Sequence, residues 1–104
     1  SEGGEETLES DVLIWEGVRL VHTPGHTPGS ISVLVEADET FAIAGDAMPT
    51  EDNARKWVPP GHHYDRLKAM ESMAMLIEAA DVVVPGHGPA FRTAPYKEKG
   101  RRGE

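Results

Sequence analysis

The stretch SISVLVEADETFAIAGDAM, residues 30–48, decides the fold that we predict for this chain. Apolar and β-branched residues dominate positions 30–36 and 40–45, and the Ala37-Asp38-Glu39 segment between them is typical of a turn. The two runs therefore predict neighbouring strands joined as a hairpin. The second run ends at Gly45-Asp46, so a carboxylate follows directly on an apolar strand.

The residues before this hairpin predict a second one. Positions 12–15 and 18–23 favour β structure, and Glu16-Gly17 between them is typical of a tight turn. After the central hairpin, residues 46–61 are polar and rich in proline, which predicts a loop.

In the next segment the spacing of apolar residues becomes that of a helix. From Asp65, which suits an N-cap, to Ala80, apolar residues recur at helical spacing. The predicted buried stripe contains Leu67, Met70, Met73, Ala74, Leu76 and Ile77. Residues 82–84 then form a fifth strand, which Pro85-Gly86 ends. The predicted order is four strands, a helix and a strand.

Both faces of the predicted sheet are apolar. Ile31, Val33 and Val35 point to one face of their strand, whereas Leu34 points to the other. One helix covers one face, and a sheet that is buried on both sides needs another layer. The fold class that we predict is therefore α+β with α/β-type layers, in which one sheet face lacks its cover.

Composition limits the function classes. The length of 104 residues suits one domain. The net charge of −8 means that the chain lacks the excess of basic residues that is typical of nucleic-acid-binding proteins. The absence of cysteine excludes disulfides, thiolate metal sites and cysteine nucleophiles. No apolar run approaches the roughly 18 residues that span a bilayer, and the acidic start is unlike a secretory signal. We expect a cytoplasmic protein that binds neither nucleic acid nor membrane.

Charge also divides the chain into three parts. Residues 1–11 form an acidic N-terminal segment, and residues 96–104 form a charged tail. The folded part is predicted to be residues 12–95.

Histidines and one aspartate are the candidates for chemistry. All five histidines fall in predicted loops or at strand ends, namely His22, His26, His62, His63 and His87. His26, Asp46 and His87 each follow a predicted strand, and two imidazoles with one carboxylate suit Zn²⁺, with iron or manganese as alternatives. Taken singly, each has a plainer interpretation as a solvated loop histidine or a turn aspartate.

Three motifs make the interpretation more specific. TPGHTPGS, GDAM after an apolar strand, and VVVPGHGP, in this order, resemble the third, fourth and fifth metal motifs of the metallo-β-lactamase superfamily. The resemblance covers residues 12–91 and corresponds to the C-terminal half of the family's αββα sandwich. It implies that His26 is the third histidine of the first metal site, Asp46 the carboxylate that bridges both metals, and His87 the histidine of the second site.

The sequence also departs from the family pattern. The HxHxDH signature of the N-terminal half is absent, and GHHYD at residues 61–65 has the wrong spacing and position to replace it. The helix that follows PGHG in the family is not expected here, because Pro95 and charged residues occupy its place. The chain therefore resembles half of a sandwich with part of a dinuclear site.

Other polar residues are candidates for the surroundings of the metals. We expect His22, Thr27 and Ser30 to support the ligands or to lie at the surface. His62 and His63 either face a substrate pocket or are solvated.

Two functions follow from the resemblance. In the first, the chain is the C-terminal half-domain of a metal-dependent hydrolase of small molecules, inactive until the missing N-terminal half joins it. The substrate stays open among lactones, thioesters, β-lactams and phosphodiesters, and the resemblance is also compatible with redox chemistry. In the second, the chain is a non-catalytic half-domain that forms a homodimer through its open sheet face, and any metal is bound only partially or structurally.

Overall fold

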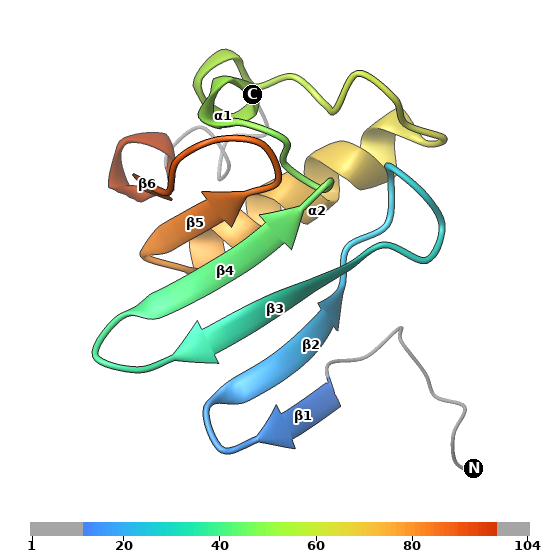
Figure 1. The fold of residues 1–104 in the computed structure, drawn as a ribbon. Helices are drawn as coiled ribbons and strands as arrows, with labels where there is room; N and C mark the ends of the chain where they lie inside the picture. Colours follow the sequence, from blue (N-terminus) through green and yellow to red (C-terminus); the bar gives the residue numbers. More distant parts are fainter. Residues whose placement is uncertain (1–11, 98–104) are drawn as a thin grey trace, which may run out of the picture.

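The computed structural model of the chain describes residues 12–97. Its centre is a six-stranded sheet in which strands that are consecutive in the sequence lie side by side (Figure 1). All neighbouring strands are antiparallel except β4 and β5, which are parallel. The strands are β1 Val12–Trp15, β2 Val18–His22, β3 Ile31–Glu36, β4 Thr40–Gly45, β5 Val82–Pro85 and β6 Phe91–Arg92.

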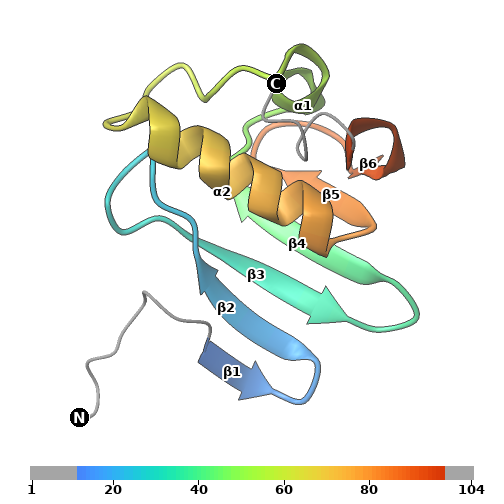
Figure 2. The ribbon, with the colours of Figure 1, turned by 180° about the vertical axis from the view of Figure 1, so that it is seen from behind.

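Helix α2, Arg66–Ala79, connects β4 to β5 and covers one face of the sheet (Figure 2). Asp65 caps its start, because the side chain accepts a hydrogen bond of 3.0 Å from the backbone N–H of Lys68. Small residues in β4, Ala42 and Ala44, are buried beneath the helix layer and leave room for it to approach. The predicted order of four strands, a helix and a strand is confirmed, with α1 and β6 as additions.

The buried stripe of α2 differs from the predicted one: it includes Ala69 and Ser72, the predicted Met70 and Ala74 are only partly buried, and Leu67 is exposed. The helix buries Ala69, Ser72, Met73, Leu76 and Ile77. Leu67 was predicted in this stripe, and this prediction is wrong, because 68% of its surface is exposed. Leu67 lies about 180° around the helix from the fully buried Leu76, on the side away from the sheet.

The predicted loop at residues 46–61 contains a short helix, α1, Glu51–Lys56, so the prediction of a continuous loop is wrong. Thr50 begins the helix as a capping box: its hydroxyl accepts from the N–H of Asp52, and its own N–H donates to Asn53. Acidic residues in the first turn and basic residues in the last turn interact favourably with the helix dipole and stabilise the helix. Local capping therefore outweighs the prolines that follow.

The chain after β5 adds an aromatic contact to the core. The rings of Phe91 and Tyr96 pack edge to face with centroids 5.9 Å apart. Tyr96 lies in a 3₁₀ turn, Ala94–Tyr96, in the segment where no helix is predicted from the sequence. Its hydroxyl donates to Glu51 at 2.5 Å, and this bond together with burial raises the pKa of Tyr96 above its ordinary value.

The packed chain reaches residue 97. Tyr96 is buried, and Lys97 donates to the carbonyls of Glu78 and Ala80 at 3.2 Å each. Both residues belong to the predicted tail 96–104. The rest of that tail, 98–104, and the predicted acidic segment 1–11 lie outside the described residues.

The face of the sheet opposite α2 is apolar and open. Ile31 and Ile43 leave 40% and 44% of their surfaces exposed, and Val33 and Val35 on the same face of β3 are half-buried. Neither helix of residues 12–97 lies over this face (Figures 1 and 2). The described chain is therefore two layers, a helix layer and a sheet, as the apolar character of both sheet faces indicated.

None of the helices within residues 12–97 has the length and apolar character needed to cross a membrane. The cytoplasmic location expected from the sequence stays a prediction.

Leu76→Ala and Leu67→Ala test the orientation of α2 with the same chemical change on the same helix. Leu76 is fully buried, so its truncation is expected to lower the free energy of unfolding by about 2–5 kcal/mol. Leu67→Ala is expected to change it by less than about 0.5 kcal/mol. Urea denaturation of the two variants measures both values, and equal losses would contradict the observed orientation.

Candidate metal site

Strand directions bring three loops to one edge of the sheet. β2 and β4 run in the same direction because each is antiparallel to β3, and β5 is parallel to β4. The carboxyl ends of these three strands therefore lie along the same edge (Figure 1). His26 follows β2, Asp46 follows β4 and His87 follows β5. Loops at such an edge are a common place for functional residues in α/β-type sheets.

The structure brings these three side chains together around the carboxylate of Asp46. His26 Nε2 lies 3.6 Å from Asp46 Oδ2, and His87 Nε2 lies 3.6 Å from Asp46 Oδ1. Each carboxylate oxygen thus faces a different imidazole. The carboxylate lies between two histidines that are 61 positions apart in the sequence (87 − 26).

This arrangement is not a cage for a single ion. Within residues 12–97, no three His, Asp or Glu side chains are grouped closely enough to hold one ion together. The carboxylate and the two imidazoles instead form two His–Asp pairs that share Asp46. The side chains of Asp46 and His87 are 58% and 72% exposed, so their outer sides are open to further ligands.

Close contact of two glycine turns fixes the distance between Asp46 and His87. A Cβ atom on Gly86 would lie 2.8 Å from the carbonyl oxygen of Gly45, which real side chains do not tolerate. The N–H of Gly86 donates to Met48 and the N–H of His87 donates to Pro49. The turn after β5 therefore packs directly on the segment after β4, and only glycine at position 86 allows it.

His26 is held by a residue from another part of the chain. Its Nδ1 atom makes a hydrogen bond of 2.6 Å with the main-chain carbonyl of His62, 36 positions away. A carbonyl only accepts, so Nδ1 carries the hydrogen. The sequence contained no signal for this contact, because every residue has a carbonyl group.

The remaining candidate histidines also bond to carbonyls. His22 Nε2 donates to Pro28 at 2.7 Å and ties the two ends of the loop after β2 together. His63 Nδ1 donates to Pro60 at 2.7 Å and closes the turn before α2. The structure therefore places His22 and His63 in loop-shaping hydrogen bonds, and His62 beside His26 through its main chain.

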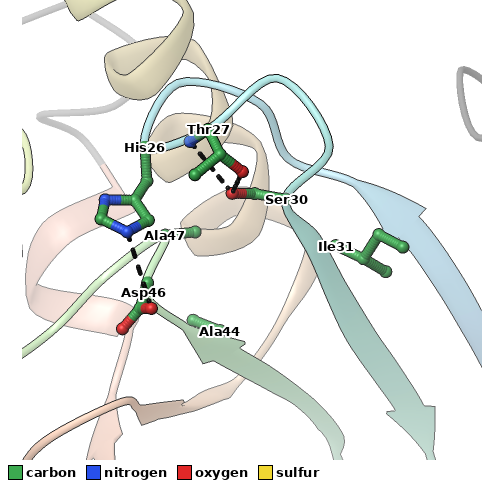
Figure 3. Close-up of a pocket in the computed structure, with 7 residues that line it drawn as sticks. All are labelled: His26, Thr27, Ser30, Ile31, Ala44, Asp46 and Ala47. Carbon is green, nitrogen blue, oxygen red and sulfur yellow. Dashed lines mark hydrogen bonds and ion pairs between the residues drawn. The ribbon is translucent and has the colours of Figure 1, made fainter. Parts of the chain in front are cut away.

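A pocket of about 260 Å³ opens beside His26 and Asp46 (Figure 3). Thr27 and Ser30 lie on its wall, where their hydroxyl oxygens are 2.8 Å apart. In Figure 3 the imidazole of His26 points toward the carboxylate of Asp46. The lining residues are His26, Thr27, Ser30, Ile31, Ala44, Asp46 and Ala47.

Known proteins are similar to this chain in sequence. A family model described as the metallo-beta-lactamase superfamily matches residues 2–87. Metallo-beta-lactamase domain-containing protein 1 of Xenopus laevis is 40% identical over 83 residues, which cover 78% of this chain and 35% of that protein. A probable metallo-hydrolase of Methanocaldococcus jannaschii is 35% identical over 82 residues, which cover 79% of this chain and 37% of that protein. The chain spans about a third of the length of these relatives.

A solved structure extends the similarity to the fold. An N-acyl homoserine lactone hydrolase, with the product N-hexanoyl-L-homoserine bound at its catalytic metal centre, superposes with a TM-score of 0.60. It is 32% identical, and the match covers 67% of this chain and 28% of the hydrolase. The resemblance predicted from TPGHTPGS, GDAM and VVVPGHGP is confirmed. The chain belongs to the metallo-β-lactamase superfamily.

Proposed function

We propose that this chain is the C-terminal half of a metal-dependent hydrolase with two metal ions, in which His26 would bind one ion, His87 the other, and Asp46 both. The observation that carries the proposal is the position of the Asp46 carboxylate, with an imidazole nitrogen 3.6 Å from each of its oxygens. The other ligands would come from the half of the domain that contains the HxHxDH signature in the family.

The donor atoms fit divalent cations. Nδ1 of His26 carries the hydrogen of the hydrogen bond to His62, so in the neutral form of the ring, the form that binds metals, Nε2 presents a lone pair to Asp46 Oδ2, which is also an acceptor. Two acceptors that face each other are stabilised by a cation beside them. Imidazole and carboxylate together suit zinc, and iron and manganese accept the same donors.

The proposed roles divide the chemistry between metal and protein. Divalent ions at this site would act as Lewis acids toward a carbonyl or phosphoryl oxygen and lower the pKa of water to about 7. His26, Asp46 and His87 would hold and orient the ions, and none of them would be needed as a general base. Catalysis would therefore depend on the completeness of the ligand set.

The pocket beside His26 supports a small-molecule substrate. Hydroxyls of Thr27 and Ser30 offer hydrogen bonds on one part of its wall, and Ile31 and Ala44 make another part apolar. Such a lining suits a compact ester, lactone or thioester with a short apolar group better than a highly charged substrate. The lactone hydrolase that shares the fold acts on a molecule of this kind.

Asp46→Asn tests the metal site with little change of shape. The substitution replaces one acceptor oxygen by an NH₂ donor, so zinc affinity is expected to fall by more than about tenfold, the lower end of what loss of an outer partner costs. Calorimetric titration of the metal-free chain with zinc measures the affinity.

The matched control for this titration is Asp38→Asn. Asp38 is exposed in the turn between β3 and β4, so the change removes the same charge far from the site. Its affinity for zinc is expected to equal that of the unaltered chain. Equal affinities for the unaltered chain and Asp46→Asn would exclude Asp46 as a ligand.

Hydrolysis by the chain alone tests the half-domain part of the proposal. Each ion would have one histidine and the shared Asp46 from this chain, whereas catalytic zinc ordinarily has about three protein ligands. With zinc present, the chain is therefore expected to hydrolyse p-nitrophenyl acetate no faster than Asp46→Asn does. Zinc-dependent turnover that Asp46→Asn abolishes would mean that the chain is a complete catalyst by itself.

The open sheet face favours the second candidate, a homodimeric half-domain. Exposed Ile31 and Ile43, together with half-buried Val33 and Val35, form one apolar surface opposite α2. A second copy packed on this face would supply the missing layer, and a stable contact would bury more than about 1,000 Å². The metal ligands would then have a structural role at most.

Ile43→Lys and Leu67→Lys distinguish the two candidates. If the face is a dimer interface, a lysine at position 43 is expected to convert a dimer to a monomer, because it buries an unpaired charge. Lysine in place of exposed Leu67, on the far side of α2, is expected to leave the dimer intact. Sedimentation equilibrium measures the masses, and a folded monomer of the unaltered chain would contradict the homodimer.

A further inference from the structure

The loop after β2 and the segment before α2 hold each other through hydrogen bonds in both directions. The side chain of His26 donates to the carbonyl of His62 at 2.6 Å. In return, the N–H groups of Tyr64 and Asp65 donate to the carbonyl of Gly25 at 2.7 and 3.3 Å. Each segment thus contains both a donor and an acceptor for hydrogen bonds to the other segment. These bonds fix the position of the two segments relative to each other.

The loop after β2 is also anchored on α2 itself. Gly25 has a φ of 137°, and a Cβ atom at this position would lie 2.3 Å from the Cα of Ala69. One turn further along, the hydroxyl of Ser72 donates to the carbonyl of Pro24 at 2.7 Å. The backbone next to His26 therefore rests on the helix, and the remaining freedom lies in the imidazole ring.

The His62 carbonyl removes that freedom. Because it accepts from Nδ1, it selects the ring orientation and tautomer in which Nε2 faces Asp46 at 3.6 Å. His63 shapes the turn that presents this carbonyl, since its own Nδ1 donates to Pro60 at 2.7 Å. The side chain of His62 itself is exposed.

We propose that residues 60–65 are a positioning element for His26, in which the His62 carbonyl sets the tautomer and His63 holds the turn. The value of this element for metal binding rests on the proposed function above. Its effect on His26 does not, because the contacts exist within the chain without a metal.

The tautomer of His26 is measured by long-range ¹H–¹⁵N NMR of the metal-free chain at pH 8.5, well above the ordinary imidazole pKa of about 6.5. His26 is expected to be fixed with its hydrogen on Nδ1. A mixture of both tautomers in the unaltered chain would overturn the proposal without any variant, and whether or not zinc binds.

Three variants then test the turn. His63→Ala removes the bond to Pro60 and is expected to release His26 into a mixture of tautomers. His63→Asn places an amide N–H near the position of Nδ1 and is expected to restore the single tautomer. His62→Ala keeps the carbonyl and is the matched control, with an expected spectrum for His26 like that of the unaltered chain. Amide fingerprint spectra check that each variant is folded.

Zinc titration of the same variants separates this proposal from the metal site. If the site binds zinc, His63→Ala is expected to lower the affinity for zinc by about 10–100-fold, and His62→Ala is expected to leave the affinity unchanged. A fixed tautomer in a chain that binds no zinc would support the positioning element and contradict the metal site. A folded His63→Ala with unchanged tautomer and zinc affinity would overturn the role of His63.

Discussion

The parallel pairing of β4 with β5 is the constraint on which the rest of the structure depends. Gly45 and Pro85 are partners in this register, so the two strands end side by side and their following residues share one edge. An antiparallel β5 would place His87 at the opposite edge, far from Asp46. A parallel connection requires a long crossover, and α2 provides it while covering the sheet face that it crosses.

Main-chain contacts then bring the loops of this edge within side-chain reach of each other. Gly86 lies against Gly45, and Gly25 lies against Ala69, in both cases too closely for any other residue. Carbonyl groups rather than side chains complete the arrangement, as at His62. A site built this way depends on backbone positions, so its geometry is sensitive to substitution of Gly25 and Gly86.

Within the described residues, the uncovered apolar face of the sheet and the exposed side chains of the candidate metal site adjoin each other. Ile31 and Ile43 are exposed on the uncovered face, and Asp46 and His87 are exposed at its rim. A second β layer would bury the first pair by the hydrophobic effect and approach the second pair with additional ligands. Folding and completion of the proposed metal site would thus be one event.

The sequence by itself determined the strands β1 to β5, α2 and the motifs that contain His26, Asp46 and His87, because apolar periodicity and turn residues are local signals. The capping box at Thr50 was also local, but the prolines after it led to the prediction of a loop. Only the tertiary structure decided that Leu67 faces away from the sheet, since helical spacing alone fits several stripes. It likewise decided which carbonyl holds His26, because all residues carry the same main-chain acceptor and only folding selects one of them.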